Sequence, residues 1–100
     1  MRLTQDQVKK ISGTLREHFG NQSLIYLFGS RLDDQARGGD IDIYLEPELS
    51  DADLIAKAMI KAKVMLYQQL GEQKIDLVIN RHQSPALPIY EHALSTGVQL

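Results

Sequence analysis

The sequence predicts one α/β (α+β) domain, a small mixed three-stranded sheet in the order 1-2-3 with helices packed on one face. Three short apolar runs, at about residues 23–28, 40–45 and 74–79, have the length of strands. Two longer segments, at about residues 4–18 and 50–70, repeat apolar residues at helical spacing. The chain has 100 residues, near the usual size of one domain, so residues 1–100 are expected to form a single unit.

Three helices are expected from their caps and apolar spacing. The first begins after Thr4, a suitable N-cap, and ends before Gly20, with Val8, Ile11, Leu15 and Phe19 on its inner face. The second is capped by Ser50 and ends at Gly71. Its inner face is expected to hold Leu54, Ala58, Lys61, Met65 and Leu66. The third covers about residues 89–95.

The most informative motif lies between the first two strands. Gly29-Ser30 ends the first apolar run, and after nine further residues Asp40-Ile41-Asp42 opens the second. Residues two apart on a strand point to the same face, so Asp40 and Asp42 would present adjacent carboxylates. A third acid, Asp76, lies early in the third run. Like charges so placed repel each other, and a divalent cation offsets that cost.

The turn at Gly29-Ser30 predicts a phosphate-binding site. Gly29 leaves room for a ligand to approach the backbone, Ser30 offers a hydroxyl and an N–H, and Arg31 adds a guanidinium. Three carboxylates and such a turn are what metal ions and a triphosphate require. We therefore expect nucleotide binding at this turn and metal binding at the three aspartates.

The motif positions also predict the topology. Gly29-Ser30 lies at the end of the first strand and Asp40 at the start of the second, so one site requires these strands to be antiparallel neighbours. Asp42 and Asp76 both lie early in their strands, which should therefore be parallel and joined by the long helix. The acids are then expected opposite the helices or at the rim of the sheet.

The segment from Phe28 to Leu45, together with Asp76, resembles the polymerase-β-type nucleotidyltransferase superfamily. That superfamily is marked by a Gly-Ser pair, a gap of about this length, Asp-x-Asp and a third Asp on a later strand. The likeness extends over about residues 24–97. In size the chain is similar to the minimal nucleotidyltransferases, which are often encoded beside a HEPN-domain protein in toxin–antitoxin pairs.

The resemblance implies a polymerase-β-like core and a magnesium-dependent transfer of AMP from ATP to a hydroxyl. Asp40 and Asp42 would hold two Mg²⁺ ions, and Asp76 would complete the site on the acceptor side. Gly29, Ser30 and Arg31 would bind the phosphates. The acceptor implied by the family is a tyrosine of a partner HEPN toxin, which would make this chain the antitoxin.

Two alternatives remain open. The chain could be a non-catalytic antitoxin that binds and occludes its partner, although all three acidic positions are filled. It could also be a small-molecule adenylyltransferase, although such enzymes usually need a second domain to hold the acceptor.

Composition disfavours several other classes. The net charge is −2 without a basic block, which argues against an extensive nucleic-acid surface. The absence of cysteine excludes disulfides and thiolate sites and fits the cytoplasm. No signal peptide or membrane span is expected. The histidines (His18, His82 and His92) lack ligand spacing, and the tyrosines (Tyr26, Tyr44, Tyr67 and Tyr90) are expected at the edge of the core.

Overall fold

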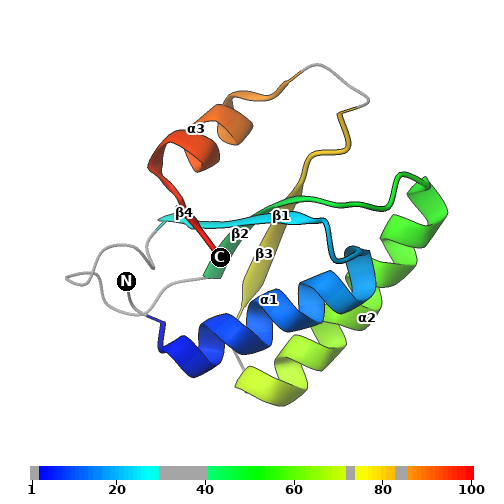
Figure 1. The fold of residues 1–100 in the computed structure, drawn as a ribbon, viewed down its shortest axis with the longest axis vertical. Coiled ribbons are helices and arrows are strands. Elements are labelled where there is room, and N and C mark those ends of the chain that lie inside the picture. Colours follow the sequence, from blue (N-terminus) through cyan, green and yellow to red (C-terminus); the bar gives the residue numbers. More distant parts are fainter. Residues whose placement is uncertain (1–2, 30–40, 72–73, 83–85) are drawn as a thin grey trace.

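A mixed sheet in the order β3-β2-β1-β4 lies at the centre of the fold (Figure 1). The structure is a computed structural model of the chain and describes residues 3–29, 41–71, 74–82 and 86–100. The strands are β1 (Leu24–Phe28), β2 (Ile41–Glu46), β3 (Ile75–Ile79) and β4 (Val98–Gln99), and the helices are α1 (Gln5–Phe19), α2 (Ala52–Leu70) and α3 (Pro88–Thr96). The chain is therefore an α+β domain.

The pairing of β1, β2 and β3 confirms the predicted topology. β1 runs antiparallel to β2, with Phe28 opposite Asp42. β2 runs parallel to β3, with Asp42 opposite Asp76, and α2 lies in the connection between them. The order 1-2-3 is correct, and it brings Asp42 and Asp76 to the same level of the sheet.

The sheet has a fourth strand, so the expectation of three strands was wrong. β4 has two residues and pairs antiparallel with β1, Val98 lying opposite Leu27. The Leu100 N–H extends this pairing by donating to the Ile25 carbonyl at 2.9 Å, and Arg16 donates to the Leu100 main-chain oxygen at 3.0 Å. A two-residue strand has no periodicity that a sequence pattern could reveal.

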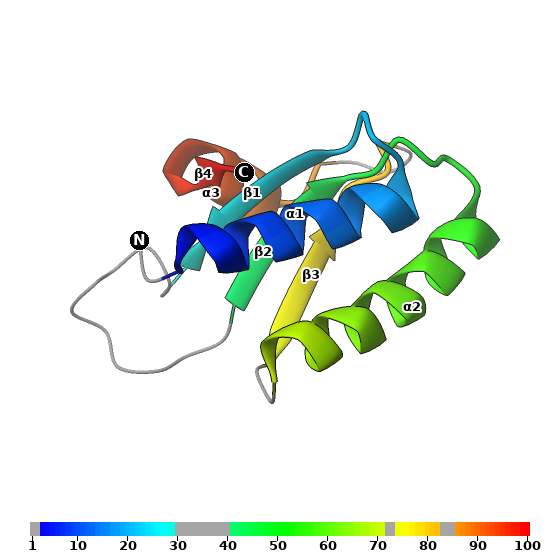
Figure 2. The same ribbon diagram turned by 60° about the horizontal axis from the view of Figure 1, so that its bottom comes forward.

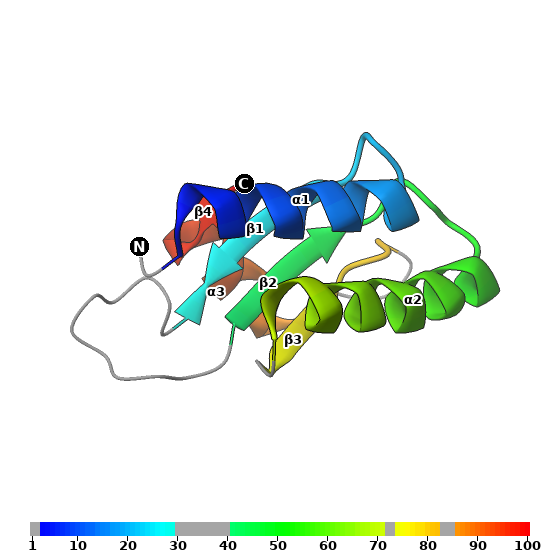
Figure 3. The ribbon, with the colours of Figure 1, turned by 90° about the horizontal axis from the view of Figure 1, so that it is seen from below.

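α1 and α2 lie side by side on one face of the sheet, and together with it they enclose the main core (Figure 3). The strands supply alternate residues to this layer, as expected for a sheet with one face buried against helices. The fully buried side chains of this main core are Ile25, Leu27, Ile41, Ile43 and Leu45 from the strands, Ile11, Leu15 and Phe19 from α1, and Ala62 and Leu66 from α2. Each large aliphatic side chain stabilises the fold by about 1.5–3 kcal/mol.

α1 begins and ends where the sequence predicts. The Gln7 N–H donates to Thr4 Oγ1 at 3.1 Å, and the Thr4 N–H donates to Gln7 Oε1 at 2.9 Å, which forms a capping box. The helix ends at Gly20, whose φ of +110° favours glycine. Within the described part of the chain, no helix combines the length and the apolar character that crossing a membrane requires.

α2 has the predicted extent but a different cap and a different inner face. Its cap is Asp51, not Ser50, and the Asp51 carboxylate accepts from the Leu54 N–H at 3.0 Å. Leu54 and Lys61, expected inside, are exposed. The buried residues are Ile55, Ala58, Ala62 and Leu66. Apolar residues occur around most of this helix, so the periodicity alone could not choose the side that faces the sheet.

α3 lies on the opposite face of the sheet from α1 and α2 (Figures 1 and 2). Tyr90 and Ala93 of α3 pack with Phe28 and Tyr44 in a second, smaller core. The expectation that all helices pack on one face was therefore wrong. The physical reason is that Phe28 of β1 and Tyr44 of β2 form an aromatic surface on this face of the sheet, and this surface needs a cover.

A substitution at Gly97 tests the placement of α3 and β4. A Cβ at this position would overlap the Ala93 carbonyl oxygen and lie 2.9 Å from the Leu27 carbonyl oxygen. Because both contacts are with backbone, we expect Gly97→Ala to lower the free energy of unfolding by about 1–3 kcal/mol. Chemical denaturation measures this change. The control is Gly13→Ala in α1, where no atom lies within 4 Å of the new Cβ and a gain of about 0.5–1 kcal/mol is expected.

Candidate functional site

The face of the sheet beneath α3 carries three successive groups of side chains. Asp42 and Asp76 form an acidic row across β2 and β3, and Phe28 lies beside Asp42 on β1. Two residues further along β2, Tyr44 and its register partner Tyr26 form an aromatic row, with Val78 of β3 on the other side of Tyr44. Beyond it is a polar end made by Glu46, Asn80 and His82. Each step of two residues corresponds to about 6.6 Å along a strand.

The acidic row has the chemistry of a site for a divalent cation. Asp42 and Asp76 are register partners on parallel strands, and their side chains are half-buried. Neighbouring strands lie about 4.8 Å apart, so the two carboxylates emerge from the sheet side by side. Like charges directly opposite each other destabilise a sheet, and a cation between them offsets this repulsion. Carboxylate oxygens are also the ligands that Mg²⁺ prefers in proteins.

Gly29 joins the end of β1 to this row. Its φ is +81°, a conformation that side-chain-bearing residues rarely adopt. A Cβ at Gly29 would overlap Oδ2 of Asp42 and lie 3.1 Å from the Asp42 Cγ. Glycine is therefore required twice, for the turn of the backbone and for the close approach of the carboxylate. The predicted phosphate turn and the predicted metal site thus meet at Gly29 and Asp42.

The remaining predicted site residues, Ser30, Arg31 and Asp40, lie outside the described residues. Asp40 directly precedes β2, which begins at Ile41 with an N–H that donates to the Lys74 carbonyl at 3.0 Å. Within the described ranges, no cluster of three or more His, Cys, Asp or Glu side chains could share a metal ion. The described part of the site thus comprises Gly29, Asp42 and Asp76.

The aromatic row covers the face of the sheet next to the acids. Tyr44 is completely buried, with Tyr26 edge-on to its ring at 6.3 Å and Tyr90 of α3 tilted against it at 5.8 Å. The Tyr90 hydroxyl donates to the Ile79 carbonyl at 3.3 Å, which fastens α3 to the end of β3. This layer separates the acidic row from the polar end of the same face.

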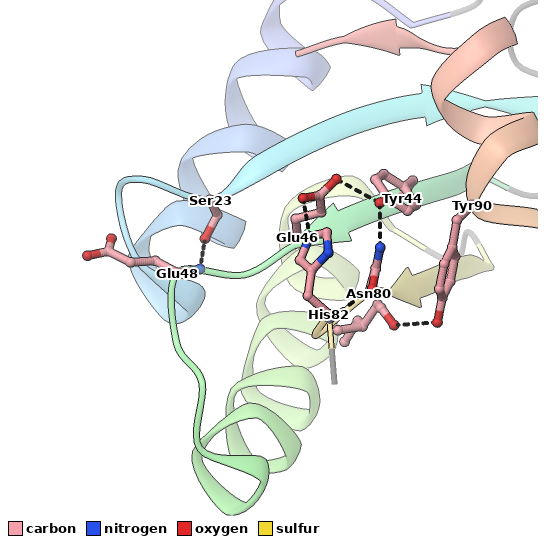
Figure 4. Close-up of polar contacts among 8 residues, drawn as sticks. Ser23, Tyr44, Glu46, Glu48, Asn80, His82 and Tyr90 are labelled. Carbon is pink, nitrogen blue, oxygen red and sulfur yellow. Dashed lines mark hydrogen bonds and ion pairs between the residues drawn. The ribbon is translucent and has the colours of Figure 1, made fainter. Parts of the chain in front are cut away.

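The polar end is a connected hydrogen-bond network (Figure 4). The Tyr44 hydroxyl donates to Glu46 Oε2 at 2.7 Å and accepts from Asn80 Nδ2 at 3.0 Å. The other oxygen of Glu46 lies 2.5 Å from Nε2 of His82. The His82 N–H in turn donates to Asn80 Oδ1 at 2.9 Å, with His82 at a φ of +58°. The network ties the ends of β2 and β3 to the chain that leads to α3.

Burial raises the pKa of the Tyr44 hydroxyl to about 12. The hydrogen bond from Asn80 opposes this change, whereas the bond to Glu46 and its negative charge act in the same direction as burial. The hydroxyl is therefore a donor to Glu46 throughout the physiological range, and it holds one carboxylate oxygen in place.

Sequence reasoning did not find the polar end. Glu46 follows Asp42 by four residues on one strand, so the alternation of β2 could have placed it on the same face. Asn80 and His82 gave no such signal, because their positions depend on the turn after β3 and on the left-handed backbone of His82.

No protein-family model and no curated protein matched this chain. The functional assignment therefore depends on the motif in the sequence and on the arrangement of the acidic row.

A double-mutant cycle tests the contact between Gly29 and Asp42. We expect Gly29→Ala to lower the free energy of unfolding, because it adds both the cost of a positive φ and the overlap with the carboxylate. In an Asp42→Ala background only the cost of the backbone conformation should remain, about 1–2 kcal/mol. Chemical denaturation of the four proteins should give a coupling of about 1–2 kcal/mol. Additive costs would place the Asp42 carboxylate away from Gly29.

Tyr44→Phe tests the polar end. At neutral pH the variant should lose about 1–3 kcal/mol of unfolding free energy, because buried Asn80 Nδ2 loses its acceptor. Between pH 10 and about 12, Tyr44 of the unfolded wild type ionises while the folded state retains the proton, so the wild type loses stability as the pH rises. The gap between the two proteins should therefore narrow over this range in denaturation experiments. A gap that stays constant would contradict the burial and bonding of this hydroxyl.

Proposed function

We propose that the chain is a magnesium-dependent nucleotidyltransferase that moves AMP from ATP to a hydroxyl group and releases pyrophosphate. The observation that carries this proposal is the acidic row with its neighbouring glycine. Asp42 and Asp76 are register partners on adjacent strands, and Gly29 lies against the Asp42 carboxylate. The pairing of an acid cluster with a turn suited to phosphate is the combination that phosphoryl transfer requires.

Gly29, Ser30 and Arg31 form the phosphate side of the proposed site. The positive φ of Gly29 lets the backbone turn beside the Asp42 carboxylate, and backbone N–H groups in such a turn bind anions. Ser30 and Arg31 contribute by their chemistry, as a hydroxyl donor and as a guanidinium that pairs with phosphate oxygens. Their proposed role derives from the sequence motif.

Asp40, Asp42 and Asp76 form the metal side. Held by these carboxylates, two Mg²⁺ ions would supply neutralisation of the triphosphate charge and activation of the attacking hydroxyl. Asp76 lies on β3, an edge strand of the sheet, so it is the carboxylate nearest to an acceptor that approaches from that edge. The family resemblance likewise implies the acceptor side for Asp76.

In the transfer, the acceptor oxygen forms a bond to the α-phosphorus while the bond from this phosphorus to the α,β-bridging oxygen breaks. Pyrophosphate leaves in line, and the hydroxyl proton passes to Asp76 or to water. The aromatic row and α3 cover the sheet beyond the acids, which favours an acceptor that enters from the open side of the acidic row.

The acceptor is proposed from the family resemblance alone. It is a tyrosine of a HEPN-domain partner, whose modification would make this chain an antitoxin. A partner protein that presents its own hydroxyl requires no acceptor-binding domain, whereas a small-molecule acceptor usually requires one.

Binding of ATP tests the metal site. Isothermal titration should detect ATP binding by the wild type with Mg²⁺ and much weaker binding in excess chelator. Asp42→Asn should weaken Mg·ATP binding by at least about tenfold, which corresponds to about 1.4 kcal/mol. The matched control is Glu46→Gln, a carboxylate-to-amide change on the same strand face, which should bind Mg·ATP as the wild type does.

Equal affinity of the wild type and Asp42→Asn for Mg·ATP would place the nucleotide elsewhere. The transfer itself is tested by incubation with ATP, Mg²⁺ and a HEPN-domain partner, with the partner's intact mass as the readout. The expected product carries one adenylyl group, and Asp76→Asn should bind ATP without forming it. A partner that is silenced without nucleotide, equally by the wild type and by Asp76→Asn, would instead identify a non-catalytic, occluding antitoxin.

A further inference from the structure

α2 is apolar on two opposite sides. One side, formed by Ile55, Ala58, Ala62 and Leu66, is buried against α1 and the sheet. On the other side Ile60, Val64 and Tyr67 are exposed to 67%, 53% and 54%. Their spacing of four and three residues places them in one line along the helix, which we call the outer seam. A helix with apolar residues on both sides is typical of a helix that is covered on both sides.

The outer side of α1 is different. The exposed residues of that helix are mostly polar or charged, among them Asp6, Lys9, Lys10 and Glu17. Lys10 and Asp6 form an exposed ion pair at 3.0 Å. The two helices lie side by side on the same layer of the fold, yet only α2 presents a line of large apolar side chains to the outside. The outer seam is therefore a property of α2 and not of this face as a whole.

Positive charge flanks the outer seam on both sides. Lys61 lies on one flank and Lys63 on the other, and Lys57 extends the first flank toward the start of the helix. The only acid in α2 is Asp53 in its first turn. The whole chain has a net charge of −2, so this helix is a local basic region on an acidic protein. In coiled-coil terms the seam occupies core positions, and Lys61 and Lys63 occupy the flanking positions that select a partner by charge.

A cavity adjoins the same lysines. Lys57 and Lys61 line a space of about 290 Å³ between α1 and α2, opposite Glu17 and His18 of α1, and its apolar wall consists of Leu49, Leu54 and Ala58. Leu54 is 51% exposed there. A large apolar side chain of a bound segment could enter this space while acidic neighbours in that segment reach the two lysines.

We propose that the outer side of α2 is a docking surface for an acidic amphipathic helix of a partner protein. The partner helix would lay an apolar stripe on Ile60, Val64 and Tyr67, and carboxylates on its flanks would pair with Lys61 and Lys63. α2 is about 28 Å long, and the seam spans about 10 Å of it, so the contact matches two to three turns of one helix. This surface lies on the opposite side of the sheet from the acidic row, and its use does not depend on the proposed nucleotide chemistry.

Charge decides between the possible occupants. A second copy of the chain, packed antiparallel through the seam, would bring Lys63 against Lys63 and Lys61 against Lys61, which is repulsive. An anionic membrane would attract the lysines, but the net charge of the chain is negative, and a bilayer does not require a narrow seam or an adjoining cavity. An acidic helix satisfies the apolar line and both lysine flanks, and Lys57 and Lys61 outnumber the single carboxylate, Glu17, in the lining of the cavity.

The experiment uses isotope-labelled full-length protein without nucleotide and two designed helical peptides of about three heptads. The peptides share an apolar stripe, and their flanking positions are glutamate in one and lysine in the other. The acidic peptide should shift the backbone amide resonances of Ile60, Val64 and Tyr67, and it should bind at least about tenfold more tightly than the basic one. Lys61→Glu/Lys63→Glu should reverse this preference, and Val64→Asp should remove binding of both peptides.

The matched control is Lys9→Glu/Lys10→Glu, which changes the net charge equally on the exposed side of α1 and should preserve the preference for the acidic peptide. All substituted residues are exposed, and thermal unfolding verifies that each variant is folded. The proposal is overturned if the peptides bind equally, or if neither shifts α2. It is also overturned if sedimentation shows wild-type self-association that Val64→Asp abolishes, or if phosphatidylserine vesicles bind the wild type while the acidic peptide does not.

Discussion

The alternation of side chains along β2 is the constraint on which both faces of this protein depend. Ile41, Ile43 and Leu45 point into the core under α1 and α2, whereas the residues between them point to the α3 side. Because the side-chain period of a strand is two, a shift of one residue would exchange the two faces. Asp42 and Glu46 would then be buried among aliphatic side chains, which is far more costly than leaving them at the rim. The register of β2 that forms the core therefore also fixes the face on which the acidic row lies.

The two carboxylates on this face of β2 have different neighbours, and the neighbours decide their roles. Both oxygens of Glu46 are engaged, one by the Tyr44 hydroxyl and the other by the His82 ring. Asp42 is the register partner of a second acid, Asp76, and its carboxylate lies against Gly29. A carboxylate that is held by donors stabilises the structure around it, and two acids in register concentrate negative charge at one level of the sheet. Glu46 is thus part of the framework, whereas Asp42 is the carboxylate that we propose as a metal ligand.

α3 and the aromatic row keep these two environments apart. Tyr44 and Tyr90 form a closed layer between the acidic row and the polar end, and Tyr90 also bonds to the end of β3. α2 shows the reverse situation on the other side of the molecule, since its core side is covered and its outer seam is exposed. The molecule therefore presents two separate surfaces, an acidic one beside Gly29 and a basic apolar one on α2. We propose the first for the binding of a nucleotide with its metal, and the second for the docking of a partner helix.

The sequence by itself determined the elements that have strong local signals. The N-cap at Thr4, the strand order 1-2-3 and the antiparallel and parallel pairings followed from caps, apolar runs and the positions of Gly29, Asp42 and Asp76. These features depend on the period of the apolar residues and on the spacing of the motif residues, which are local properties of the sequence. The contribution of Ser30, Arg31 and Asp40 remains a prediction from the motif.

Only the tertiary structure decided the features that arise from long-range contact. Neither the two-residue strand β4 nor the side of the sheet that α3 covers has a local pattern, since both result from the need to cover Phe28 and Tyr44 and to pair the edge of β1. The inner face of α2 could not be chosen from periodicity, because apolar residues occur on both of its sides. The contacts of His82 with Glu46 and of Asn80 with Tyr44 each join residues 36 positions apart, and they exist only once β2 and β3 have paired.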